Sequence, residues 1–285
     1  MPLLPFKTCR ERIERAKAHR EAFAQLWNDM IQDELYYTIV RVEDDGAGGI
    51  WIEPRYDSLP DALGLELGEF LYQLRSALDA CVYAAAIVES GQDPPPHERN
   101  LEFPICDTPE AFKEADGKMR PLTKRRRDII ESVQPYNAPA LAEEYRVFNF
   151  NRTLAILNDW ARKDRHRKLH IVGSWASNAN PRVRLPDGVR LISLTTRGDG
   201  FLEHESEIAS FQLGGFVPGM KIEANPDVFV DVAVNEVPPP CADNDTLSNR
   251  VRAMVIATGA IVRGIEDSLL AERKMGIRDG PCGRF

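Results

Sequence analysis

Apolar residues recur at three- and four-residue steps in five stretches of the chain, which is the spacing of one face of an α-helix. The most continuous stripe predicts a core helix from Asp61 to about Val88, and the proline-rich run GQDPPPHERN at 91–100 ends it. The same spacing predicts helices over 6–34, about 121–134, 139–163 and about 245–272. A helical core is therefore expected.

Two other regions change to a period of two and are rich in β-branched and aromatic residues. LYYTIVRV (35–42) and GIWIEPRY (49–56) are linked by the turn-forming run DDGAGG and predict a hairpin. Within 169–236, RVRL and VRLISL flank the turn residues Pro186-Asp187-Gly188, and VFVDVAV (228–234) alternates strictly. This second region predicts a partly exposed sheet.

The order of these elements predicts an α+β fold in a single compact unit spanning 1–285. Residues 1–168 are expected to be mainly helical with an N-terminal β-hairpin, and 169–236 to form a mostly antiparallel sheet packed against the helices. The C-terminal helix at 245–272 is expected to return to the helical core formed by 1–34 and 60–165.

Composition narrows the class of protein. The N-terminus enters charged sequence without the apolar region and small-residue cleavage site of a secretory signal, and no window approaches the roughly 18 apolar residues of a membrane span. The five cysteines are widely spaced with no CxxC pair, which indicates reduced thiols in the cytoplasm. The formal charge of −8 disfavours a general nucleic-acid coat protein, although a local basic patch is compatible with it.

The first candidate site lies on the core helix, in GEFLYQLRSALDACVY (68–83). Arg75 and Asp79 are one helical turn apart, on a stripe rotated away from the leucine face. An arginine and a carboxylate in this setting indicate either catalytic residues or a partly buried ion pair that fixes helix packing.

The second candidate is LNDWARKDRHRKLH (157–170), where basic residues and two histidines surround Asp164. Here His166 is a candidate acid or base oriented by Asp164, and Arg165 and Arg167 are candidate phosphate ligands. The alternative is a solvated basic helix end that complements the helix dipole. His166 and His170 are also spaced as two metal ligands would be, but the zincin glutamate is missing and the local charge is positive, so no metal is expected.

A third candidate is the basic run in PLTKRRRDII (121–130), which adds Arg125 and Arg126 as possible phosphate ligands. Such a run is usually a solvated face, and it gains interest if folding brings it beside 162–168. P-loop, dinucleotide-binding and nucleophile-elbow motifs are missing from the sequence, so no cofactor is expected.

These motifs resemble those of a widespread group of uncharacterised bacterial proteins, chiefly actinobacterial. Members carry an LRSALD-containing helix, an FPI segment, a QPY segment and an LN-x-x-DKHR segment, which correspond here to 68–83, 103–105, 134–136 and 157–167. The group's arginine followed five residues later by histidine is similar to the signature of HEPN domains, helical modules common in RNase toxins and defence proteins. In this chain Arg75 is present, but Ala80 occupies the histidine position.

The resemblance implies a cytoplasmic protein that acts on or binds RNA or a nucleotide, and a homodimer paired through helices. One hypothesis is a metal-independent ribonuclease-like enzyme in which Arg75 stabilises phosphate charge and His166 is the general base, with Asp79 and Asp164 completing the catalytic set. A second is a binding module without cleavage, and a third is a structural or interaction protein with a buried Arg/Asp network. Arg75, Asp79 and the 164–167 turn are expected to be spatial neighbours. The strand-rich segment 169–236, including His204, is expected to be scaffold or interface and not catalytic.

Overall fold

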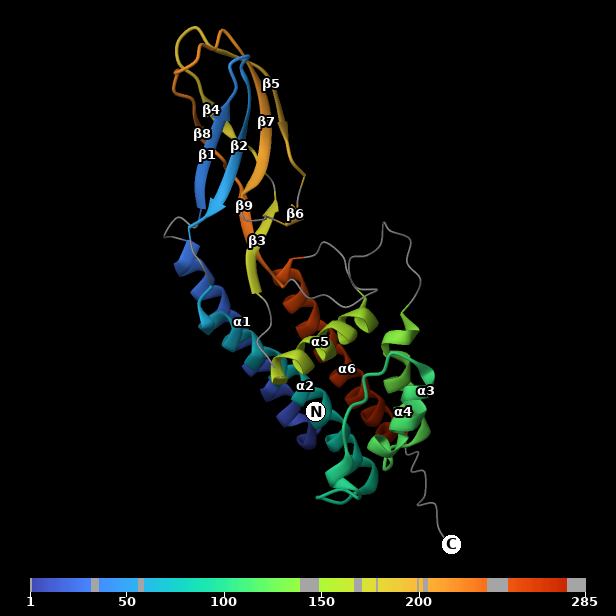
Figure 1. Ribbon diagram of the computed structural model, residues 1–285. Coiled ribbons are helices and arrows are strands. Elements are labelled where there is room, and N and C mark those ends of the chain that lie inside the picture. The colour runs from blue at the N-terminus through green and yellow to red at the C-terminus, as the bar shows by residue number, and fades with distance from the viewer. Residues whose placement is uncertain are drawn as a thin grey trace.

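The computed structural model has an α+β fold, in which helices form one end of the molecule and antiparallel strands the other (Figure 1). The described residues are 2–31, 36–55, 59–138, 149–166, 171–177, 179–198, 200–201, 205–234 and 246–275. The helices are α1 (Lys7–Ile31), α2 (Asp61–Ser90), α3 (Pro109–Glu114), α4 (Lys124–Ser132), α5 (Phe150–His166) and α6 (Leu247–Met275). Short 3-10 helices are η1 (Leu4–Phe6), η2 (Glu98–Asn100), η3 (Ala115–Met119) and η4 (Pro135–Asn137). The strands are β1 (Tyr36–Val42), β2 (Ala47–Pro54), β3 (Ile171–Ser177), β4 (Arg182–Arg184), β5 (Arg190–Thr196), β6 (Gly200–Phe201), β7 (Ser206–Gly214), β8 (Glu223–Asn225) and β9 (Phe229–Val234).

Helix α2 is the central helix of the helical end and packs against α1, α5 and α6. Its leucine stripe is buried, as the spacing predicted, and Gly91 ends the helix in the left-handed conformation with its N–H bonded to the Ile87 carbonyl. Helix α6 returns to this core. Its Glu266 accepts hydrogen bonds from the Leu3 backbone N–H at 2.6 Å and from Arg10 at 3.0 Å, so α6 contacts the N-terminal segment.

The predicted helices at 121–134 and 139–163 correspond to α4 and α5, each shorter than expected. Helix α5 begins at Phe150, and the predicted helical residues 139–148 lie outside the described part of the chain. Of the cysteines, Cys9, Cys81 and Cys106 are described and are free thiols.

The N-terminal hairpin is part of the sheet formed by the second half of the chain. The strand order in the main sheet is β1-β2-β7-β5. Strands β2 and β7 are antiparallel, and Ile50 is paired with Ala209. A side chain at Gly48 would lie 2.7 Å from the Phe211 ring and 2.5 Å from the Arg41 carbonyl oxygen, so this strand needs a glycine there. The sequence predicted the hairpin but not its partner.

The buried apolar residues form two clusters, one among the helices and one within the strands. The strand cluster is centred on β2 and β7, whereas the helical cluster also takes in Val232 and Val234 from β9. Val228, at the other end of the alternating VFVDVAV run, packs against the strand cluster. The run from Val228 to Val234 therefore connects the two cores, as does Tyr36, which packs against both.

Within the described residues, no helix combines the length and the apolar character that crossing a membrane requires.

Candidate functional site

Four of the predicted site residues line one groove between α2 and α5, which we call the α2–α5 groove. It has a volume of about 390 Å³ and includes Arg75 and Asp79 from α2 and Asp164 and Arg165 from α5. His166, the last residue of α5, is exposed and is not among the residues that line the groove. Arg167, His170 and His204 lie outside the described residues, so their predicted roles stay predictions.

Gly68 allows the two helices to approach at this groove. A Cβ atom at Gly68 would lie 2.5 Å from an oxygen and 2.9 Å from the Cγ of the Asp164 carboxyl group, far inside normal contact distance. The Asp164 carboxylate therefore packs directly on the backbone of α2. Because the glycine provides the space, the LRSALD-containing helix and the LN-x-x-DKHR-like segment meet here.

The α2–α5 groove is acidic. Its lining carries three carboxylates, Glu69, Asp79 and Asp164, against the guanidinium groups of Arg75 and Arg165. Burial, and then the neighbouring Glu69, raise the pKa of Asp164, which makes no hydrogen bond or ion pair with the described residues. This charge balance opposes a phosphate ligand.

Replacing Asp164 by Asn should raise the melting temperature slightly at pH 7. A pKa above its ordinary value means that ionisation destabilises the folded state, so the penalty is present at neutral pH and disappears once the carboxyl group is protonated, below about pH 3. Thermal melts across this pH range measure the effect, with the exposed Asp267→Asn on α6 as the control. A loss of stability at pH 7 would instead indicate that the carboxylate is held by a cation.

The Arg75 guanidinium group is held by hydrogen bonds within the protein. It donates to Asp79 at 2.7 Å, to Glu102 at 3.0 Å and to the Phe103 carbonyl oxygen at 2.6 Å, and Asp79 in turn accepts from the Phe103 N–H at 2.9 Å. Burial raises the pKa of Asp79, although Arg75 and the Phe103 N–H act in the opposite direction. Both backbone groups of Phe103 are thus held by the Arg75/Asp79 pair.

Gln134 holds the next part of the same segment. Its buried side chain accepts from the Cys106 N–H at 2.8 Å and donates to the carbonyl oxygens of Pro104 and Ile130, both at 2.9 Å. The LRSALD, FPI and QPY motifs therefore meet in one hydrogen-bonded clamp on residues 103–106. This arrangement supports the structural alternative for Arg75 and Asp79.

The basic run on α4 is paired with carboxylates along its whole length. Lys124 pairs with Asp128, Arg127 with Asp116, and Arg125 with Glu272. Arg126 is fully buried and forms ion pairs with Glu89, at 3.1 Å, and with Glu272. The expectation that Arg126 binds phosphate therefore has no support from its position, because no phosphate group reaches a buried guanidinium that two carboxylates already hold.

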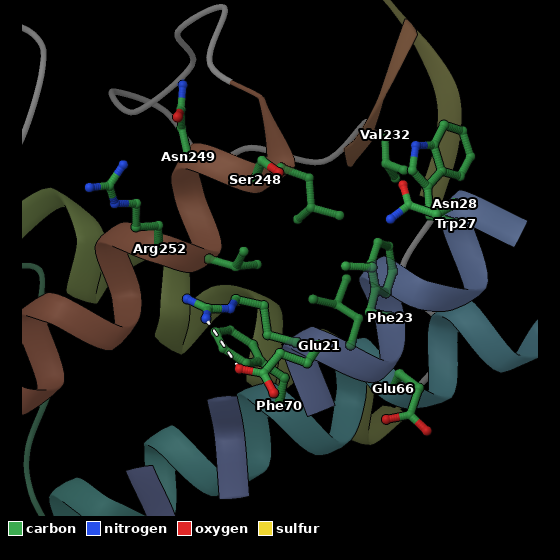
Figure 2. A pocket seen from close by; sticks show the side chains of 15 residues that line it. Glu21, Phe23, Trp27, Asn28, Glu66, Phe70, Val232, Ser248, Asn249 and Arg252 are labelled. Atoms are coloured by element: carbon green, nitrogen blue, oxygen red, sulfur yellow. Dashed lines mark ion pairs between the residues drawn. The ribbon is translucent and has the colours of Figure 1, made fainter. Parts of the chain in front are cut away.

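A second and larger cavity lies where α1, α2, α6 and β9 meet, and we call it the α1–α6 pocket (Figure 2). Its volume is about 530 Å³. Its apolar lining includes Phe23, Trp27, Leu67, Phe70, Val232, Leu247 and Val251, and its polar lining includes Arg20, Glu21, Asn28, Glu66, Ser248, Asn249 and Arg252.

Sequence reasoning missed this pocket. The apolar spacing over 6–34 predicts a helix, but nothing in this local pattern indicates that Phe23 and Trp27 line a pocket together with the start of α6 and a strand. The signal is tertiary, because the lining residues come from four elements that are far apart in the chain.

Among the described residues, no group of three or more histidine, cysteine, aspartate or glutamate side chains is arranged to hold a metal ion. Comparisons with protein-family models, with curated proteins and with solved structures find no significant match.

Proposed function

We propose that this protein binds a small, largely apolar molecule in the α1–α6 pocket, without catalysing its conversion. The observation that carries the proposal is the pocket itself, a cavity of about 530 Å³ whose lining combines aromatic and aliphatic residues with polar ones. Ligand sites in proteins have this size and composition and commonly lie where two structural units meet. Here the pocket lies where the helical end meets β9.

Binding is favoured over catalysis by the chemistry of the lining. The ionisable residues among those that line the pocket are two arginines and two glutamates, Arg20, Arg252, Glu21 and Glu66. Nucleophilic catalysis requires a nucleophile beside a base, and general acid–base catalysis requires a group poised near neutral pH. The apolar walls supply neither, but they do supply the burial that retains an apolar ligand.

The test is a fluorescence titration with the neutral apolar probe N-phenyl-1-naphthylamine. We expect saturable binding of one probe per chain, and a loss of affinity of about tenfold or more in Ala24→Trp, because the indole would fill space in the pocket. Ala24 is exposed at the pocket lining, so the change does not disturb the core.

The matched control is Ala18→Trp, an exposed position on the same helix that does not line the pocket. Both variants should melt as the unmodified protein does, and only Ala24→Trp should lose probe binding. Equal probe binding by both variants would place the probe elsewhere and contradict the proposal.

RNA or nucleotide binding, with or without cleavage, stays a prediction, as do the cytoplasmic location and the helix-paired homodimer. The acidic α2–α5 groove and the paired basic run give the nucleic-acid hypothesis less support than the pocket gives ligand binding. RNA binding that weakens steeply with added salt would support the nucleic-acid hypothesis over ligand binding.

A further inference from the structure

Of the four charged residues that line the α1–α6 pocket, Arg252 is the one without a charged partner among the described residues. Arg252 on α6 is exposed and makes no ion pair with any carboxylate of the described residues. Arg20 on α1 pairs only with its neighbour Glu21, at 3.8 Å, and the Glu21 side chain is 74% exposed. Such a surface pair contributes little, so a ligand can compete for Arg20 at small cost.

Both acidic residues of the lining, Glu21 and Glu66, have a partner within the protein. The Glu66 carboxylate lies 2.8 Å from Nδ1 of His19, within hydrogen-bond and ion-pair distance. A cationic ligand would have to displace His19 from Glu66 or Arg20 from Glu21, whereas an anionic ligand finds Arg252 without an ion-pair partner among the described residues. The pairing of these charges, and not their number, therefore favours an anion.

The start of α6 adds to this selection. Thr246 caps the helix through a bond from the Asn249 N–H to its Oγ1 at 3.3 Å, and the first turn contains no acidic residue. Ser248 and Asn249 from this turn line the pocket. The partial positive charge at a helix N-terminus favours an anion nearby, in addition to the two arginines.

We propose that the ligand of the α1–α6 pocket is an amphipathic monocarboxylate of the fatty-acid type. In this proposal the carboxylate contacts Arg20 and Arg252, and the alkyl chain lies among the aromatic lining residues Phe23, Trp27 and Phe70. Figure 2 shows Arg252 on the side of the pocket away from Trp27 and Val232, which leaves the Trp27 side for the end of the alkyl chain. An arginine fork matches a carboxylate in geometry as well as charge. This inference rests on the proposed function.

The experiment compares three probes that share one alkyl chain: decanoate, decanol and decylamine. Each displaces N-phenyl-1-naphthylamine from the full-length protein at concentrations below micelle formation. We expect decanoate to act at about tenfold lower concentration than decanol, because a charge-assisted hydrogen bond contributes more than a neutral one, and decylamine to be the weakest.

Substitutions of Arg252 and Arg20 test whether these residues cause the preference for decanoate over decanol. Arg252→Gln and Arg20→Gln should each weaken decanoate several-fold and leave decanol unchanged. Arg263→Gln is the matched control, since Arg263 is exposed on α6 but does not line the pocket. Unchanged melting temperatures in all three would exclude a loss of folding.

The outcomes separate the inference from the proposed function. If decanol competes as well as decanoate, or if decylamine is the strongest, the carboxylate assignment is overturned while the apolar pocket stands. The assignment is also overturned if Arg252→Gln and Arg20→Gln bind decanoate as the unmodified protein does. If neither the naphthylamine probe nor any alkyl compound binds, the pocket is not a ligand site and both proposals fail together.

Discussion

Replacing Arg126 by alanine should lower the free energy of unfolding by about 3–5 kcal/mol, the usual cost of removing one partner from a buried ion pair. Arg126 is fully buried, and the change would leave Glu89, which is itself 9% exposed, without its cation. Burial already raises the pKa of Glu89, and the loss of Arg126 would raise it further. Urea denaturation measures the effect.

The free energy of unfolding that Arg126→Ala loses should depend on pH, because the partners of Arg126 are the carboxylates of Glu89 and Glu272. We call this loss the Arg126→Ala deficit. Arg126 lowers the pKa of both Glu89 and Glu272, so it stabilises the fold most where they are ionised. The deficit should be largest at neutral pH and should shrink toward about pH 4, where the carboxyl groups of the variant take up protons.

Arg125→Ala is the matched control for Arg126→Ala, because both residues pair with Glu272. The Arg125 side chain is 54% exposed, and a surface pair of this kind contributes about 1 kcal/mol or less. Equal losses in the two variants would contradict the structural role of Arg126. If an Arg126 variant lost RNA binding but kept its stability, the result would support Arg126 as a phosphate ligand.

Arg75→Ala should cost roughly 2–3 kcal/mol, less than Arg126→Ala because its partners Asp79 and Glu102 are partly exposed. The change removes three hydrogen bonds and leaves the Phe103 carbonyl oxygen without its donor. Arg75→Lys should lose part of this amount, since an ammonium group cannot reproduce the planar fork. Thermal and urea denaturation give the comparison.

The Arg75 experiment also separates a structural from a functional role. Arg75 does not line the α1–α6 pocket, so any Arg75→Ala protein that remains folded should bind the naphthylamine probe with unchanged affinity. A variant with full stability but altered binding of RNA or a nucleotide would favour the catalytic hypothesis for Arg75.

Local periodicity was sufficient to predict the α+β class and the longer helices, but not the short α3 (Pro109–Glu114). The stripe of α2 and the returning α6 were predicted because a buried helix face repeats every three to four residues, whatever its partners are. The grouping of Arg75, Asp79, Asp164 and Arg165 in one groove was also anticipated. The expected reason was wrong, however, because Arg75 finds its partners in Asp79, Glu102 and Phe103 and not in the 164–167 segment.

What could not be predicted depends on contacts between distant parts of the chain. Arg126 reads as one residue of a solvated basic run, and only its position between Glu89 and Glu272 shows that it is buried. The α1–α6 pocket likewise needs four elements in place before it exists. The LRSALD, FPI and QPY motifs are explained in structural terms by the clamp on 103–106, which gives no indication of a substrate.

The pairing of β2 with β7 has a consequence for how the chain folds during synthesis. The hairpin is made early, but the strand that covers its inner edge comes only at Ser206–Gly214. Until then Ile50 and Ile52, both buried in the finished sheet, lack their partners, and an isolated two-stranded hairpin is only marginally stable. An exposed apolar strand edge is prone to pair with other chains. A nascent chain that stops before β7 should therefore depend on chaperones, and fragments ending there should aggregate.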